Sequence, residues 1–225
     1  NMRVRFSGET NIGMKRKHNE DSFLIPDYER VAVVADGMGG HASGEVASGM
    51  AVQCVGEYLQ STLEQPIVTW PFKLDTGVRH DTHRLTIAIK HANQRIYETA
   101  QRDEEKHGMG TTIVAALFSD DRVIVAHVGD SRCYRLRRNQ LIQLTEDHSL
   151  LNDYMKMKRL SGEDGARFTQ KNVIVRALGM KESVQVDTMI DQPQIDDIYL
   201  LCSDGLSGMV SDPGLAEIMR SESDL

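Results

Sequence analysis

Three apolar segments of this chain each end at an aspartate that stands beside a glycine. They are residues 31–35 before Asp36-Gly37, residues 123–128 before Gly129-Asp130, and residues 198–202 before Ser203-Asp204-Gly205. A short apolar run bounded by turn residues is typical of a buried strand, and glycine allows the sharp turn that leaves a neighbouring carboxylate at the rim of a sheet. The pattern predicts a strand-rich fold in which several strand ends present acids.

Two interpretations of these aspartates are open. In the first, each aspartate simply caps a turn or a helix start. If instead they converge, their mutual repulsion calls for a hard divalent cation with oxygen ligands, magnesium or manganese. The four glycines in residues 36–45 favour convergence, because they give more conformational freedom than a turn needs. That segment lacks both the dinucleotide-binding fingerprint and the P-loop lysine, so a metal site is favoured over a phosphate cradle.

Nine short segments have the composition of strands. They are residues 4–6, 22–25, 31–35, 111–118, 123–128, 133–137, 141–144, 184–190 and 198–202. Two of the connections, residues 119–122 and 138–140, have the length and polarity of hairpin turns. The sheet portion is therefore predicted to be largely antiparallel.

Helical periodicity is clearest in residues 45–63 and 83–101, which predict two amphipathic helices. A third helix is expected near Asp147 and a short one near Pro213. Residues 65–81, with two prolines and no period, predict an irregular surface excursion, and residues 160–170 predict a flap.

The charge balance excludes some partners. With 33 acidic against 26 basic residues the net charge is −7, which gives no electrostatic footprint for nucleic acid or an anionic membrane. No apolar run approaches the roughly 18 residues of a membrane-spanning helix. The three cysteines, Cys54, Cys133 and Cys202, are widely spaced and odd in number, which argues against a disulfide framework and favours a reducing cytoplasm.

Five motifs, in order, resemble those of the bacterial metal-dependent Ser/Thr protein phosphatases of type 2C, the PPM family. They are Gly13-Met14-Lys15-Arg16-Lys17-His18-Asn19-Glu20-Asp21, Val34-Ala35-Asp36-Gly37-Met38-Gly39-Gly40-His41, Gly108-Met109-Gly110-Thr111-Thr112, His127-Val128-Gly129-Asp130-Ser131-Arg132 and Cys202-Ser203-Asp204-Gly205-Leu206. The resemblance implies an α/β (α+β) fold, a four-layer sandwich of two mainly antiparallel sheets flanked by helices.

The resemblance also implies a binuclear Mn²⁺ or Mg²⁺ centre. In it Asp36 would bridge both ions, the Gly37 carbonyl would bind one, Asp204 the other, and Glu20 would act through a bound water. Asp130 matches the ligand of a third, weaker ion.

The implied activity is hydrolysis of phosphoserine and phosphothreonine in proteins by a water that bridges the metals, opposing a bacterial Ser/Thr kinase in signal transduction. Arg16 matches the arginine that grips the substrate phosphate, and His41 lies where a general acid is wanted. We expect a cytoplasmic monomer whose partners are phosphorylated proteins, with no nucleic acid and no membrane insertion.

Departures from the family pattern leave an alternative open. Gly208 stands where many members have an acid, and Asn172 stands at the flap position before Val173, so the third ion is expected to be held weakly. The chain stops at Leu225 before an Asp-Asn motif, so residues 2–225 are expected to be a single phosphatase domain truncated before its last strand. The alternative is a catalytically silent phosphatase fold that acts as a regulatory or phosphoprotein-binding module.

Overall fold

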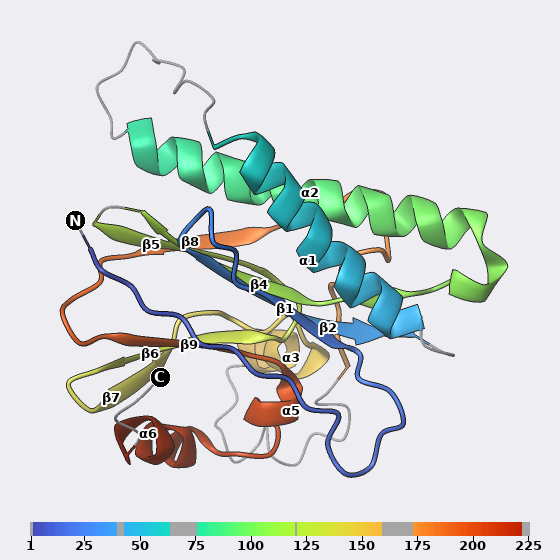
Figure 1. Cartoon of the computed structure of the whole chain (residues 1–225). Helices are drawn as coiled ribbons and strands as arrows, with labels where there is room; N and C mark the ends of the chain where they lie inside the picture. Colours follow the sequence, from blue (N-terminus) through green and yellow to red (C-terminus); the bar gives the residue numbers. More distant parts are fainter. Residues whose placement is uncertain (1, 40–42, 64–75, 120, 159–172, 222–225) are drawn as a thin grey trace.

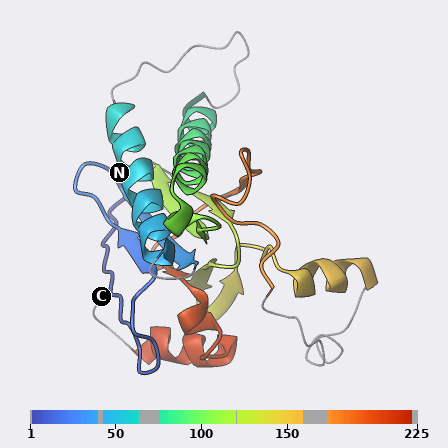
Figure 2. The ribbon, with the colours of Figure 1, turned by 90° about the vertical axis from the view of Figure 1, so that its right-hand side faces the viewer.

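The computed structural model of the chain describes residues 2–39, 43–63, 76–119, 121–158 and 173–221. It has four layers, with helices α1 and α2 outside one β-sheet and helices α5 and α6 outside a second (Figure 1). Helix α3 (Leu150–Lys158) projects to one side, which is clearest in the rotated view (Figure 2). The predicted sandwich of antiparallel sheets flanked by helices is therefore confirmed.

The larger sheet has the strand order β1-β2-β4-β5-β8, with the short β3 also paired to β2, and every pairing is antiparallel. Its strands are β1 (Asp21–Leu24), β2 (Val31–Met38), β3 (Gly110–Thr111), β4 (Ile113–Ser119), β5 (Arg122–Val128) and β8 (Asp187–Asp191).

Strand β2 shows how the sheet divides its side chains between two faces. Val31, Val33 and Ala35 are buried in the core beneath helices α1 (Ser43–Ser61) and α2 (Thr76–Arg102). The alternate residues face the second sheet, where Val34 packs against the inter-sheet core. Asp36 belongs to these alternate residues, so its side chain lies on the face of β2 that looks toward the second sheet.

The smaller sheet has the order β7-β6-β9, formed by β6 (Arg132–Arg137), β7 (Gln140–Gln143) and β9 (Ile198–Cys202). Phe118 of the larger sheet meets Tyr199 of the smaller one edge to face, with ring centroids 5.4 Å apart. On the outer face Tyr134 and Cys202 pack against Leu215 of helix α6 (Asp212–Ser221).

Most of the predicted strands and helices are present. The turn at residues 138–140 is a two-residue hairpin in which Arg138 and Asn139 both have positive φ, 47° and 65°, as the twist of a tight hairpin requires. Helices α3 and α6 match the two expected near Asp147 and Pro213.

Two predictions were wrong in part. Residues 4–6 form no strand; they are apolar because Val4 and Phe6 pack on the inter-sheet core, and Phe6 contacts Phe118 edge to face. Helix α2 begins at Thr76, so residues 76–81 are helical rather than irregular. Residues 65–75 of the expected excursion and the expected flap at residues 160–170 lie outside the described residues.

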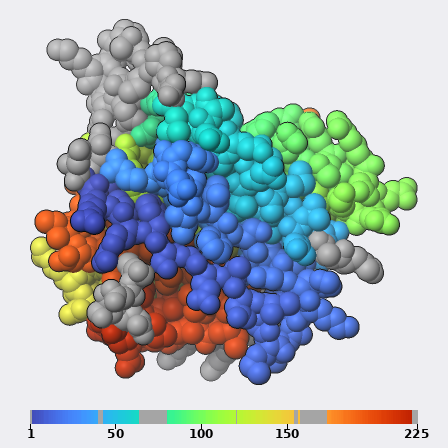
Figure 3. Space-filling model, in the orientation of Figure 1, coloured from blue at the N-terminus to red at the C-terminus, as the bar shows by residue number. Residues whose placement is uncertain are grey.

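The N-terminal segment, residues 2–10, runs across the open side of the gap between the sheets (Figures 1 and 3). A cavity of about 1220 Å³ lies beneath it, lined by β2 and β9 and reaching Asp21 and Ser203 at one end. No helix within the described ranges is long and apolar enough to cross a bilayer.

Candidate metal centre

The end of β2 is shaped by the start of helix α1. Gly37 is buried, and a Cβ at this position would collide with the carbonyl oxygen of Gly44 in the first turn of the helix. Only glycine lets the backbone pass so close, and this fixes the position of the neighbouring Asp36. The Gly37 N–H donates to the Glu20 carbonyl oxygen at 2.9 Å, which ties the same point to the start of β1.

The carboxyl of Asp36 lies among other acids. Asp21 is its direct partner in the β1–β2 register, and Asp204 reaches it from the other sheet, at the start of the short helix α5 (Asp204–Ser207). Burial and then the charges of Asp21 and Asp204 raise the pKa of Asp36 to about 9. The Ser203 hydroxyl donates to Asp21 at 2.8 Å and so joins the end of β9 to β1.

Asp130 lies in the turn by which the chain crosses from β5 in one sheet to β6 in the other. Burial raises the pKa of its carboxyl to about 6, and the charges of Asp204 and Asp147 act in the same direction. Asp204 is thus within electrostatic reach of both Asp36 and Asp130. The three aspartates, Asp36 near the end of β2, Asp130 after β5 and Asp204 after β9, meet at one end of the sandwich.

Two buried hydroxyls connect the backbones of these aspartates. Thr112 accepts the Asp36 N–H on its hydroxyl at 3.1 Å and donates its own N–H to the Asp36 carbonyl at 2.9 Å. The hydroxyls of Thr112 and Ser131 are 2.6 Å apart, and Ser131 directly follows Asp130. The ends of β2 and β5 are therefore held in a fixed relation to each other.

Arg16 and Glu20 stand at the solvent side of the site. The Arg16 guanidinium lies 3.5 Å from the Glu20 carboxylate, and the Arg16 side chain is 59% exposed. An exposed ion pair of this kind holds the arginine weakly. Its guanidinium is free to bind an anion that approaches the carboxylates.

The donor set fits a hard divalent cation. Within the part of the chain that the structure describes, the carboxylates of Asp21, Asp36, Asp130 and Asp204 have no lysine or arginine ion-pair partner within 4.0 Å. Oxygen ligands of this kind are those that Mg²⁺ and Mn²⁺ take. Burial raises the pKa of Asp36 most, and bound cations would offset the repulsion by Asp21 and Asp204 that raises it further.

Some residues of the site were not singled out from the sequence. Asp21 follows Glu20 within a recognised motif, but only strand register shows that it faces Asp36. Thr112 and Ser131 each stand inside a motif, yet neither carries a sequence signal of its hydrogen bond. His41 and Asn172 lie outside the described residues, so their predicted roles stay predictions.

Comparisons with known proteins agree with this arrangement. A family model described as Protein phosphatase 2C matches residues 14–222. The chain is 39% identical over 219 residues to the serine/threonine phosphatase stp of Listeria welshimeri, covering 96% of this chain and 83% of that protein.

Solved structures are similar over the same extent. The S. agalactiae serine/threonine phosphatase has a TM-score of 0.81 at 34% identity, covering 96% of this chain and 86% of that one. The catalytic domain of the serine/threonine protein phosphatase PstP, in complex with two manganese ions, has a TM-score of 0.75 at 32% identity, covering 92% of this chain and 80% of that one. The chain belongs to the protein phosphatase 2C family.

Proposed function

We propose that this chain is a metal-dependent protein phosphatase that hydrolyses phosphoserine and phosphothreonine. The observation that carries the proposal is the meeting of Asp36, Asp130 and Asp204 at one end of the sandwich, beside an exposed Arg16. Family membership and the names of its relatives support an enzyme over a silent regulatory module.

The chain's oxygen donors divide into a core set and an outer ligand. Asp36 would bind both core ions, with the Gly37 carbonyl on one, Asp204 on the other and Glu20 acting through water. Asp130 would bind a third, weaker ion. We favour Mn²⁺ or Mg²⁺ as the ions, and the two manganese ions in PstP support a binuclear centre. Such ions, when bound, supply an activated water and neutralise the charge of the transferring phosphoryl group.

Arg16 would orient the substrate. Its planar guanidinium can donate two parallel hydrogen bonds to phosphoryl oxygens, which lysine reproduces poorly. Because the pair with Glu20 is exposed and long at 3.5 Å, little is lost when Arg16 turns to the substrate. Protonation of the departing seryl or threonyl oxygen is the role proposed for His41.

The cysteines are unsuited to act as nucleophiles. A reactive cysteine needs a lowered pKa, yet burial raises the pKa of Cys202 to about 11 and raises the pKa of Cys54 and Cys133 as well. These free, buried thiols suit a reducing compartment, so we place the protein in the cytoplasm. There it would reverse the action of a Ser/Thr kinase on phosphorylated proteins.

A substrate panel tests the proposal. Phosphate release is measured from one peptide sequence carrying phosphothreonine, phosphoserine or phosphotyrosine, with Mn²⁺, with Mg²⁺ and with EDTA. We expect turnover of the first two peptides, dependent on metal and abolished by EDTA. Binding of the phosphothreonine peptide without turnover in either metal would instead identify a regulatory module.

A further inference from the structure

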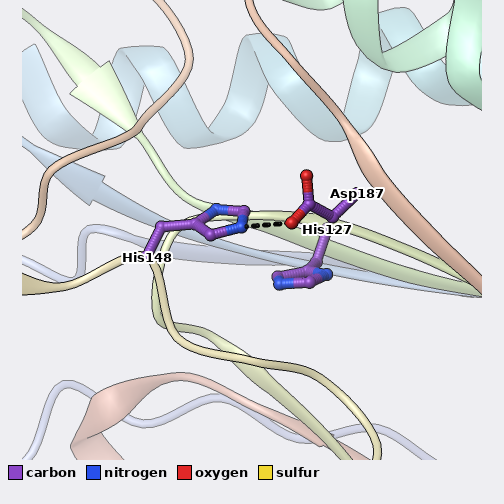
Figure 4. Close-up of side chains that lie close together, drawn as sticks. All are labelled: His127, His148 and Asp187. Atoms are coloured by element: carbon purple, nitrogen blue, oxygen red, sulfur yellow. Dashed lines mark hydrogen bonds and ion pairs between the residues drawn. The ribbon is translucent and has the colours of Figure 1, made fainter. Parts of the chain in front are cut away.

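A second group of chemically active side chains lies beside the Asp130 turn. His127 at the end of β5, His148 before α3 and Asp187 at the start of β8 place one ligand atom each within 4.8 Å of the others (Figure 4). The two imidazole rings are stacked with centroids 4.6 Å apart. Both histidines are buried, and neither has a place in the chemistry proposed above.

The hydrogen bonds of His148 argue against a metal at this group. The Gly129 N–H donates to His148 Nδ1 at 3.0 Å, so Nδ1 carries a lone pair and the neutral ring has its proton on Nε2. Nε2 lies 2.9 Å from Asp187 Oδ2 and so donates to it (Figure 4). A metal at Nε2 would need the lone pair that this tautomer lacks. The Arg176 guanidinium, 3.1 Å from Nε2 and 2.7 Å from Asp187 Oδ1, already supplies the positive charge.

His148 instead holds Gly129 from two sides. Its ring accepts the Gly129 N–H, and its own backbone N–H donates to the Gly129 carbonyl at 2.9 Å. Gly129 has φ of +109°, and a Cβ there would lie 2.7 Å from Thr112 Cγ2, so only glycine fits. The next residue is Asp130. The His148 imidazole therefore holds the peptide bond before Gly129, and the His148 backbone N–H holds the peptide bond that leads into Asp130.

The neighbours of His148 hold the same turn. The Glu146 carbonyl lies 2.8 Å from His127 Nε2, and the Asp147 carboxylate pairs with Arg132 at 2.7 Å. Three consecutive residues thus contact positions before, within and after the turn that carries Asp130. These contacts tie the residues on both sides of Asp130 to one short segment.

We propose that His148 is a positioning residue for Asp130: by holding the Gly129 peptide, with its ring oriented by Asp187, it sets the carboxylate where the weaker third cation binds. The inference rests on the proposed function, since it takes Asp130 as a ligand of that cation. Outer partners of metal ligands commonly change metal affinity by about 10- to 100-fold when they are lost.

Two amide substitutions separate the two hydrogen bonds of the ring. In His148→Asn the side-chain oxygen stands in place of Nδ1 and can still accept the Gly129 N–H, although the contact with Asp187 is lost. In His148→Gln the amide stands in place of Nε2 and can reach Asp187, but nothing accepts the Gly129 N–H. Each variant loses one hydrogen bond, so a general loss of stability would affect both alike.

The readouts are Mn²⁺ binding by titration calorimetry and the Tm of the metal-free proteins. Asp130→Asn first identifies the weak phase of the wild-type isotherm, which it should remove. We expect His148→Gln to weaken that phase about tenfold or more, and His148→Asn to stay within about threefold of wild type.

Three outcomes would overturn the inference. They are an unchanged weak phase in His148→Gln, losses in both variants that simply follow Tm, and a weak phase that survives Asp130→Asn. The proposed function is tested separately: a wild-type protein with Mn²⁺-dependent turnover and any of these results keeps the function and loses the inference. A wild-type protein that binds no Mn²⁺ and turns over no phosphopeptide loses both.

Discussion

Asp21 and Asp36 are direct partners in the antiparallel register of β1 and β2. Two carboxylates in this relation repel each other, and Asp204 adds a third charge from the opposite sheet. Burial, and then these two charges, raise the pKa of Asp36 to about 9, so the site holds a proton unless a cation replaces it. The centre is therefore built to exchange protons for metal ions.

Asp21→Asn tests this relation. The amide can still accept from the Ser203 hydroxyl, so the fold should survive, but one negative charge beside Asp36 is lost. We expect the Mn²⁺ concentration for half-maximal activity to rise by about tenfold, as for other outer partners of metal ligands. The control is Asp27→Asn, which removes the charge of an exposed aspartate in the same part of the chain and should change nothing. Equal Mn²⁺ requirements in the two variants would contradict the role of Asp21.

Asp36→Asn tests the electrostatic cost of the site in the metal-free protein. The folded-state pKa of about 9 lies above the ordinary value of 3.8, so the folded protein holds this proton more tightly than the unfolded chain. That stabilising contribution is complete below about pH 4 and is lost as the pH rises towards about 9. Asparagine does not ionise. In EDTA at pH 8 the variant should therefore have a higher Tm than wild type, by about 2–4 °C for each kcal/mol of unfolding free energy that it gains. The difference in Tm should be smaller at pH 5.

With added Mn²⁺ the wild type should instead have the higher Tm. A ligand that binds the folded state stabilises that state, and Asp36→Asn should bind Mn²⁺ poorly. The Tm of wild type and of Asp36→Asn is compared by thermal unfolding at pH 5 and at pH 8, each with EDTA and with Mn²⁺. A metal-free variant that is less stable than wild type at pH 8 would show that the Asp36 carboxylate stabilises the fold by itself.

Thr112→Val tests how the end of β2 is held. Valine has the same shape but leaves the Asp36 N–H and the Ser131 hydroxyl without their buried partner. An unsatisfied buried group costs about 1–3 kcal/mol, so the free energy of unfolding should fall by that amount. Thr112→Ser is the matched control, since it keeps the hydroxyl. Denaturant unfolding should rank wild type and Thr112→Ser above Thr112→Val, and a Thr112→Val variant as stable as wild type would show that the buried hydroxyl adds no stability.

Arg16→Ala tests substrate binding. Because the Arg16 side chain is 59% exposed and its pair with Glu20 is long, Tm should be unchanged. Loss of hydrogen bonds to a charged phosphoryl group costs about 1.5–3 kcal/mol, so kcat/KM for a phosphothreonine peptide should fall by about 10- to 100-fold. The kcat/KM of Arg16→Lys should lie between those of wild type and Arg16→Ala, and the kcat/KM of Lys17→Ala should resemble that of wild type. A Lys17→Ala loss as large as that of Arg16→Ala would mean that only the net charge of this segment matters.

Local chemistry made several features predictable from the sequence. The end of β9 before Asp204 follows from an apolar run that stops at turn residues, and the hairpin at Arg138-Asn139 follows from the preference of tight turns. These features depend on neighbours in the chain, so a pattern reveals them. Strand β2 differs, because it continues past Asp36 to Met38.

Features that depend on register and packing were not predictable. The alternation of a strand shows which residues share a face, but not that Asp21 pairs with Asp36. The hydrogen bond from the Gly129 N–H to the His148 ring joins residues 19 positions apart in the chain. Residues 4–6 have the apolar composition of a strand, yet they serve the core without pairing.

The central claim is tested most directly by the initial rate of phosphate release from a phosphothreonine peptide at saturating Mn²⁺. The rate is measured for wild type, for Asp36→Asn and for the control Asp27→Asn. That claim is that the aspartates at the strand ends form one cation-dependent hydrolytic centre. We predict metal-dependent turnover by wild type and Asp27→Asn, and a loss of at least about a hundredfold in Asp36→Asn with its fold intact by circular dichroism. Turnover by Asp36→Asn at the wild-type rate, or wild-type turnover that persists in EDTA, would contradict the account.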